Sequence, residues 1–527
     1  MAADGEEDVE TVTGVALLAD ALRSQGVEWV FGVVGIPVTN IAPALQDAGI
    51  GYIGMRNEQA ASYAASVVGY LTGRPGCCLV VTGPGLIHAL PGIANAHVNC
   101  WPLLVVAGGC DQDQIGMGAF QEWPQLEDCS RCKYAVRLET LESIPFHVEK
   151  AVRSSLYGRP GPSYIEIPGN MTSDAVPITR IEQVLPCPPP PMSLADPAAV
   201  QRAVSLLRSA QRPLVIVGKG VAYAFAEHEA RSLIVPRRLP FLPTPMGKGV
   251  LSDAHPLCVS PARSRALQEA DVILLLGARL NWILHFGLPP RFSRDVKIIQ
   301  VEICPEEFSN NVPAHLMLHG HLKPVLKQLV EEFGQWVMDR DGQWWSRLKE
   351  KIHINMNINK ELASVTSLPM NFYAAYDIMK DYIPRNAVLV NEGSATMDIG
   401  RTVFLSHFPR RRLDAGSFGT MGLGCGYAIA AALIEQRKPD GQRSPVVAIQ
   451  GDSAFGFSGM ELETASRYQL PIVFVVMNNS GIYRGVDSET WTELNEEPEL
   501  PLSLPPQVCY QEQLTTILAR RSWEKEY

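Results

Sequence analysis

The sequence predicts an α/β protein of three successive domains, each a doubly wound, Rossmann-like parallel sheet covered by helices. Three observations support this fold class. A chain of 527 residues is too long for one hydrophobic core. Short, almost wholly apolar segments alternate with amphipathic ones, which is typical of strands buried on both faces. A proline-rich stretch at 186–191 separates the first two segments.

The first domain is expected over residues 1–185. Val15, Leu17, Leu18, Ala21 and Leu22 share one face of a helix that stops near Gly26. Apolar strands are expected at 28–31, 50–54, 77–81, 103–107 and 164–168. Their continuous apolar character indicates a parallel sheet rather than a sheet with one solvent-facing side.

The second and third domains repeat the pattern. The second is expected over 195–335, with strands at 213–217, 272–276 and 297–301. A helical linker at 336–365 follows, and the third domain over 366–527 has strands at 387–390, 446–449 and 472–476. Beyond about residue 490 the composition becomes acidic and proline-rich, so we expect the last domain to be atypical or incomplete there.

Composition argues against several classes of protein. The net charge of −10 is spread along the chain, which predicts no nucleic-acid partner. No apolar stretch reaches the roughly 18 residues of a membrane span, and the first ten residues lack the apolar core of a signal peptide. The 11 cysteines lie mostly in apolar runs, which favours free thiols in a reducing compartment.

Oxygen-bearing residues follow two strands of the third domain. Gly451-Asp452-Ser453 ends one strand, and Asn478-Asn479 ends the next. Parallel strands present their carboxyl ends at one edge of the sheet, where such folds bind ligands. Asp452, Asn479 and a backbone carbonyl near Gly481 therefore form a candidate Mg²⁺ site. Asp and Asn also form simple turns after strands, but two strand ends together favour the metal site.

This motif resembles the signature of the thiamine-diphosphate enzyme family, whose three α/β domains match the order found here. The resemblance implies a pyrimidine-binding domain, a middle domain and a diphosphate-binding domain, with thiamine diphosphate and Mg²⁺ as cofactors. It assigns cofactor contacts to Glu58, Glu392, Gly393, Ser394, Thr420, Met421, Gly451, Asp452, Ser453, Asn479 and Ile482.

Glu58 matches the family's catalytic glutamate, in Met55-Arg56-Asn57-Glu58 after the strand at 50–54. The resemblance implies that its carboxyl hydrogen-bonds the aminopyrimidine ring and promotes loss of the thiazolium C2 proton. Taken alone, a glutamate at this position is also a common helix N-terminal residue stabilised by the dipole. Beside the diphosphate motif, the catalytic interpretation is favoured.

Other stretches, including 31–39, 242–249, 277–282 and 451–459, resemble the 2-hydroxyacyl-CoA lyases and oxalyl-CoA decarboxylases. Phe120-Gln121 matches the lyases, because the decarboxylases carry Tyr-Glu there. The resemblance implies cleavage of long-chain and 3-methyl-branched 2-hydroxyacyl-CoA to formyl-CoA and an aldehyde one carbon shorter, as in fatty-acid α-oxidation. Gln121 is a candidate for binding substrate oxygens. His88 is a candidate for proton transfer, and a structural histidine is the alternative.

The resemblance also implies partners. Arg159, Lys219, Arg279 and Glu302 resemble the ADP site of the related decarboxylase, and the ADP portion of CoA is an alternative occupant. In the family the cofactor lies between subunits, so a homodimer or homotetramer is expected.

The C-terminal sequence departs from the family after Trp491, and Lys525-Glu526-Tyr527 does not match a peroxisomal tripeptide. The resemblance implies a peroxisomal enzyme, with a cytosolic location as the alternative for this form. Alternative functions are oxalyl-CoA decarboxylation and an inactive or regulatory form.

Overall fold

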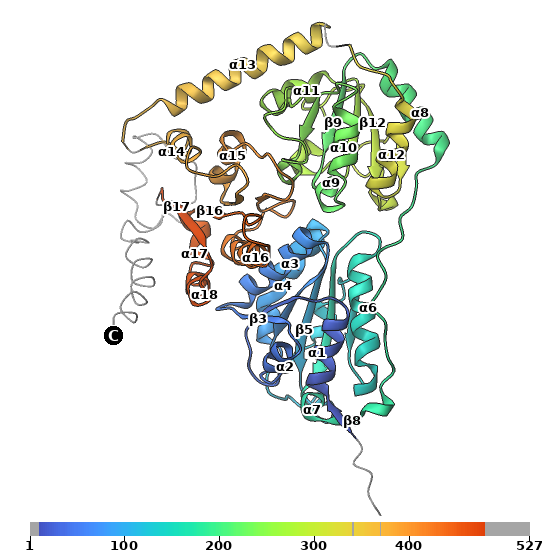
Figure 1. Cartoon of the computed structure of the whole chain (residues 1–527), viewed down its shortest axis with the longest axis vertical. Coiled ribbons are helices and arrows are strands. Elements are labelled where there is room, and N and C mark those ends of the chain that lie inside the picture. Colours follow the sequence, from blue (N-terminus) through green and yellow to red (C-terminus); the bar gives the residue numbers. More distant parts are fainter. Residues whose placement is uncertain (1–9, 340–341, 369, 480–527) are drawn as a thin grey trace, which may run out of the picture.

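The computed structural model describes residues 10–339, 342–368 and 370–479. It contains three α/β units in the predicted order, each built on a parallel sheet. Figure 1 shows the first unit in blue, the second in green and the third in orange. No helix among these residues combines the length and the apolar character that crossing a bilayer requires. The predicted fold class is confirmed.

The first domain has a six-stranded parallel sheet in the order β3-β2-β4-β5-β7-β6. Its strands are β2 (Trp29–Gly32), β3 (Gly51–Gly54), β4 (Gly76–Val80), β5 (Leu103–Gly109), β6 (Tyr134–Arg137) and β7 (Pro162–Pro168). Its helices are α1 (Gly14–Ser24), α2 (Ile41–Asp47), α3 (Glu58–Thr72), α4 (Pro84–Asn99), α5 (Gln125–Asp128), α6 (Ile144–Leu156) and α7 (Gly169–Ser173). A short antiparallel pair, β1 (Thr11–Thr13) with β8 (Ala175–Pro177), brings the two ends of the domain together.

The second domain has a five-stranded sheet in the order β10-β9-β11-β12-β13. The strands are β9 (Pro213–Val217), β10 (Phe241–Pro243), β11 (Val272–Leu276), β12 (Lys297–Glu302) and β13 (Leu316–His319). The helices are α8 (Pro197–Ser209), α9 (Lys219–Tyr223), α10 (Glu227–Ile234), α11 (Arg263–Glu269) and α12 (Leu322–Phe333). The expected helical linker is α13 (Gln343–Ala363), which spans from the second domain to the third along the periphery of the molecule (Figure 1).

The third domain has a four-stranded sheet in the order β15-β14-β16-β17. The strands are β14 (Val388–Glu392), β15 (Arg412–Leu413), β16 (Val446–Gly451) and β17 (Ile472–Met477). The helices are α14 (Phe372–Met379), α15 (Ser394–Val403), α16 (Gly424–Gln436), α17 (Asp452–Gly456) and α18 (Glu461–Arg467). The expected atypical C-terminal stretch, with Trp491 and Lys525-Glu526-Tyr527, lies outside the described residues.

The first and third domains pack closely within one chain. Helix α16 is almost fully buried, and it packs against α3 beside α4 (Figure 1). The backbone N–H groups of Arg56 and Asn57 each donate to Glu461 Oε1 at 3.0 Å, so α18 fixes the turn that starts α3. The Gly54 N–H donates to the Tyr468 hydroxyl at 2.9 Å. These contacts fix the position of α3, which begins with Glu58.

The packing of α3 on α4 depends on a glycine. A side chain at Gly92 on α4 would collide with Ser62 on α3. We therefore expect Gly92→Ala to lower the free energy of unfolding by about 1–2 kcal/mol, because overpacking outweighs the gain in helix propensity. Urea denaturation measures this change. Gly342→Ser, at the N-cap of α13 where no neighbour lies within 4 Å, is the control and should lower stability by less than about 0.5 kcal/mol, because serine is a favourable N-cap residue. Equal stability of the two variants would show that this close approach is not needed.

Candidate active site and interdomain pocket

The two predicted strand ends of the third domain lie side by side. Strands β16 and β17 are paired in parallel, with Gly451 opposite Met477. Asp452 follows β16 directly and is buried, with 2% of its surface exposed. Asn478 and Asn479 follow β17. The carboxylate and the amides therefore belong to neighbouring tips on the carboxyl edge of one sheet. The other proposed contacts here, Gly481 and Ile482, lie outside the described residues.

The surroundings of these tips suit a diphosphate group. A side-chain atom at Gly393 would lie 2.7 Å from Thr396 Oγ1 and 3.3 Å from the Gly451 nitrogen, so only bare backbone fits between β14 and β16. Ser394 begins α15, and a helix N-terminus attracts anions. The buried Ser453 hydroxyl has no hydrogen-bond partner among the described residues. Together with hard oxygen donors, these features fit Mg²⁺ and a diphosphate.

Glu392 lies at the end of β14, where its carboxylate binds backbone at the start of α16. Oε1 accepts from the N–H groups of Gly422 and, at 3.1 Å, Leu423, and Oε2 accepts from Gly424 at 2.9 Å. The Gln450 amide donates to Oε2 at 2.6 Å. Burial raises the pKa of Glu392 to about 7 against these favourable hydrogen bonds. In this structure Glu392 therefore shapes the glycine-rich loop that carries Met421.

That loop is also fixed from the first domain. The Thr420 hydroxyl lies 3.1 Å from the Tyr63 hydroxyl on α3, and it donates to the Met421 carbonyl at 3.1 Å. Gly419 and Gly422 have positive φ values of 73° and 92°, which only glycine adopts without strain. Thr420 and Met421 are thus held in a fixed position between α3 and α16. A residue that supports a bound cofactor needs such a fixed position.

Two candidate residues meet at the carboxyl edge of the first sheet. The Glu58 carboxylate accepts from or donates to His88 Nδ1 at 3.2 Å, depending on protonation. Glu58 is the first residue of α3 and His88 lies near the start of α4. The Glu58 side chain is 12% exposed, and that of His88 is 58% exposed. The hydrogen bond to Glu58 fits both interpretations of His88, proton transfer and a structural histidine, and the catalytic roles of the two residues stay predictions.

Gln121 lies on a strained loop near this pair. Its φ is +58°, and its carbonyl approaches Gly83, the residue that precedes α4.

Sequence reasoning missed two residues that hold the loop around Gln121. Glu122 accepts from the N–H groups of Gly116 and Gly118 at 2.5 and 2.9 Å, and the Gly116 hydrogen bond lowers the pKa of its carboxyl. Buried Gln125 accepts from Gly83 N and donates to the Gly108 carbonyl. Gly116 and Gly118, which precede Glu122 by six and four positions, were the sequence feature that could have indicated a tight loop bound by this carboxylate.

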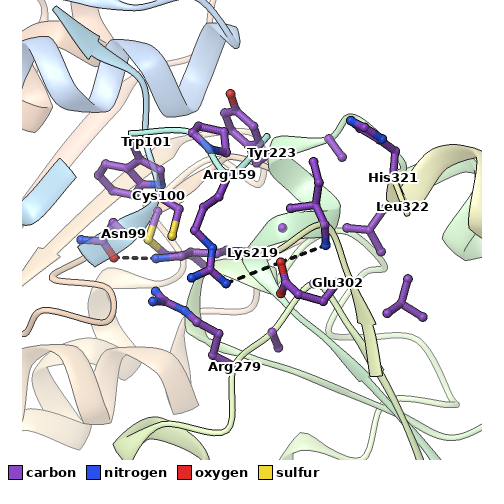
Figure 2. A pocket seen from close by; sticks show the side chains of 18 of the residues that line it. Asn99, Cys100, Trp101, Arg159, Lys219, Tyr223, Arg279, Glu302, His321 and Leu322 are labelled. Carbon is purple, nitrogen blue, oxygen red and sulfur yellow. Dashed lines mark hydrogen bonds and ion pairs between the residues drawn. The ribbon is translucent and has the colours of Figure 1, made fainter. Parts of the chain in front are cut away.

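The four residues proposed for a nucleotide site line one pocket of about 440 Å³. Figure 2 shows Arg159, Lys219, Arg279 and Glu302 converging on it from the first and second domains. The Arg159 guanidinium lies 3.7 Å from Glu302 and 2.9 Å from Glu307. Burial raises the pKa of Glu302. These four residues therefore line one pocket, and its assignment to a nucleotide stays a prediction.

Lys219 is a partly buried cation of the pocket. Its Nζ donates to Asn99 Oδ1 at 2.5 Å (Figure 2) and lies 5.5 Å from the centre of the Trp101 ring. Burial, with nearby Arg279, lowers the pKa of Lys219 to about 7. An anion in the pocket would restore the charge of this amine. Asn99 was not identified from the sequence, because nothing in its local sequence marks its distant partners.

Comparison with known proteins agrees with this division of the chain. Residues 12–128 match the N-terminal TPP binding domain of thiamine pyrophosphate enzymes, 200–329 their central domain and 392–493 their C-terminal TPP binding domain. Mouse 2-hydroxyacyl-CoA lyase 1 is 57% identical over 500 residues, covering 94% of this chain and 86% of the mouse protein.

More distant relatives extend the comparison. Human 2-hydroxyacyl-CoA lyase 1 is 54% identical over 504 residues, which cover 95% of this chain and 87% of that protein. The oxalyl-CoA decarboxylase of Escherichia coli K12 is 39% identical over 493 residues, covering 91% and 85%. The lyases are therefore closer to this chain than that decarboxylase is. The chain belongs to the thiamine pyrophosphate enzyme family and, within it, to the 2-hydroxyacyl-CoA lyases.

Proposed function

We propose that the protein is a thiamine-diphosphate- and Mg²⁺-dependent lyase that cleaves 2-hydroxyacyl-CoA to formyl-CoA and an aldehyde one carbon shorter. The observation that supports the proposal is the parallel pairing of β16 with β17, since Asp452 follows the first of these strands and Asn478-Asn479 follows the second. The identity of 57% to a 2-hydroxyacyl-CoA lyase gives the substrate class. Long-chain and 3-methyl-branched substrates are the class that the family resemblance implies.

The third domain would hold the cofactor. Asp452 and Asn479 would bind Mg²⁺, with a carbonyl near Gly481 as a further ligand, and the backbone at Gly393 and Gly451 would face the diphosphate. Met421 would pack against the cofactor. When bound, the cofactor supplies an electron sink for the carbon–carbon bond that breaks.

The first domain would supply proton transfer. Glu58 would hydrogen-bond the pyrimidine ring, and His88, half exposed beside it, would accept the proton of the substrate 2-hydroxyl as C1 and C2 separate. A proton returned to C1 completes formyl-CoA, so the reaction is balanced without an oxidant. Gln121 would orient the substrate through uncharged hydrogen bonds.

Assembly from at least two chains completes the proposal. Ile115, Met117 and Phe120 beside Gln121 are 55%, 76% and 69% exposed, which is unusual for large apolar side chains around a catalytic edge. A second copy of the chain would cover them and contribute its third domain, giving a homodimer or homotetramer. A peroxisomal location is part of the same proposal.

The product assay tests the reaction. Purified protein with thiamine diphosphate, Mg²⁺ and a 2-hydroxyacyl-CoA should release equal amounts of formyl-CoA and the shortened aldehyde, measured by mass spectrometry. Oxalyl-CoA serves as the competing substrate. Faster turnover of oxalyl-CoA would favour the decarboxylase alternative, and absence of turnover with either substrate would favour an inactive or regulatory form.

Replacing Glu58 tests its assigned role. Glu58→Gln keeps the size of the side chain but removes the acid, so we expect exchange of the cofactor C2 proton to slow by about 10²–10⁴-fold. Proton NMR in deuterated buffer follows that exchange, and calorimetry should show cofactor affinity changed by less than about tenfold. Glu10→Gln, an exposed glutamate of the first domain, is the control. Unchanged exchange in Glu58→Gln would remove Glu58 from catalysis.

The interdomain pocket supports a second binding function. We propose that it binds ADP, or the ADP portion of CoA, through Arg159, Lys219 and Arg279 with Glu302 at the ribose. The support is the pocket volume of about 440 Å³, which suits a nucleotide, and the presence of Arg159, Lys219 and Arg279 among the residues that line it. An acid at the end of a strand, as Glu302 is at the end of β12, is a common ribose partner.

Lys219 gives this binding a distinctive pH dependence. Its pKa is about 7 because of burial and nearby Arg279, and a phosphate beside it should raise that value. Above pH 7 the free amine is largely neutral and the bound one is charged, so binding should take up a proton. Calorimetry of ADP at pH 8 in buffers of different ionisation enthalpy should show uptake that approaches one proton.

Two variants decide the source of that proton. Lys219→Met should abolish the uptake, whereas Lys323→Met, which removes another lysine of the pocket lining, should leave it in place. Binding with no proton uptake in the unmodified protein would contradict the role of Lys219. Absence of ADP binding together with binding of CoA would identify CoA as the occupant.

A further inference from the structure

The side chain of Asn99 joins all three domains at one point. Asn99 is the last residue of α4 and is 1% exposed. Its Oδ1 accepts from Lys219 Nζ of the second domain at 2.5 Å and from the backbone N–H of Ser417 in the third domain at 2.9 Å. Its Nδ2 donates to Asn95 Oδ1 at 2.8 Å, one turn earlier on α4. Every polar atom of this amide is therefore used.

Ser417 belongs to the loop that leads to Thr420 and Met421. The loop runs so close to Asn99 that a side chain on Gly416 would collide with Oδ1, and Gly416 has a φ of +57°. The Ser417 carbonyl accepts from Trp282 Nε1 at 2.7 Å. The Ser417 hydroxyl lies 3.5 Å from Lys219 Nζ and 3.4 Å from Arg279 Nη2. Residues of the first and second domains thus bind both the backbone N–H and the backbone carbonyl of Ser417.

The same amide is connected to the other side of the loop. Asn95 donates to the Tyr427 hydroxyl on α16 at 2.8 Å. Helix α16 begins just after the loop and receives the Glu392 carboxylate at its N-terminus. The loop is therefore held at Ser417 by Asn99, and it ends at Gly424, the first residue of α16, whose N–H binds Glu392. The segment between them carries the proposed cofactor contacts.

We propose that Asn99 is a positioning residue for the cofactor. Its Oδ1, oriented by Lys219, sets the position of the loop at 415–421 and so of Thr420 and Met421, although Asn99 itself belongs to another domain. The inference rests on the proposed function in one respect only, that Thr420 and Met421 support thiamine diphosphate. It also implies that a ligand that draws Lys219 away from Asn99 changes the position of the loop at 415–421. Since coupling between two sites is reciprocal, a cofactor bound at the loop would in turn change the affinity of the pocket for that ligand.

Two substitutions of Asn99 separate its acceptor oxygen from its packing. Asn99→Leu keeps the volume but removes the acceptor, whereas Asn99→Asp keeps an acceptor for Lys219 and Ser417 and loses the donor to Asn95. Hydrogen exchange of peptides covering 415–422, measured by mass spectrometry on the full chain without cofactor, should accelerate about tenfold in the Leu variant. In the Asp variant it should stay within about twofold of the unmodified protein.

Cofactor affinity gives the second readout. Calorimetry with thiamine diphosphate and Mg²⁺ should show binding weakened about tenfold in Asn99→Leu and nearly unchanged in Asn99→Asp. Equal acceleration of loop exchange in both variants would overturn the proposal in favour of a general packing role. Unchanged exchange in both would overturn it as well. If the unmodified protein binds no cofactor, the proposed function fails while the exchange experiment still tests Asn99.

A lysine pair provides the test if Asn99→Leu does not fold. Lys219→Met removes the cation that orients Asn99, and we expect faster exchange at 415–422. Lys323→Met removes a lysine that lines the same pocket and serves as the matched control, with loop exchange unchanged. Equal exchange in the two lysine variants would contradict the proposal.

Discussion

The parallel pairing of β16 with β17 is the constraint on which the site depends. Their register places Gly451 opposite Met477, so the residues that follow each strand emerge together at one edge. A slip of one residue would turn the side chains of β17 to the opposite face. Helices α15 and α16 both pack on β16, which is buried along almost its whole length, and this packing fixes the strand within the sheet. A packing requirement thereby fixes the position of an acid and an amide.

A second set of contacts unites the three domains. Glu461 of the third domain binds the turn before α3 in the first, and Asn99 of the first binds Lys219 in the second and Ser417 in the third. Within the third domain, Glu392 binds the start of α16. Each uses an acceptor oxygen to hold backbone N–H groups of a distant segment. Such hydrogen bonds orient the backbone of a loop without filling the region beside the loop with further side chains. Space for a flat ligand therefore remains there. The proposed catalytic edge and the interdomain pocket are thus linked through Asn99.

The sequence was sufficient to predict most of the fold. Strands such as β9 and β11 are fully buried and uniformly apolar, so their pattern is unambiguous. Strands β6 and β13 were missed because neither is fully buried and their sequences mix polar with apolar residues. The pair β1 and β8 was missed because its three-residue strands lie far apart in the chain.

The site was predicted unevenly for a similar reason. Asp452 and Asn479 follow recognisable strands, so local sequence identifies them. The pocket residues Arg159, Lys219, Arg279 and Glu302 came from family resemblance, and the structure then brought them together. Asn99 has partners 120 and 318 positions away. No periodicity or motif spans such separations, so only the folded chain reveals it.

Metal-dependent binding of the cofactor tests the central claim most directly. Titration of thiamine diphosphate into the protein with Mg²⁺ should give saturable binding that EDTA abolishes, and Asp452→Asn should weaken it by more than about tenfold because a charged ligand to the metal is lost. Binding to Asp452→Asn as tight as to the unmodified protein, or binding indifferent to EDTA, would contradict the assignment of the two strand tips to the metal and its diphosphate.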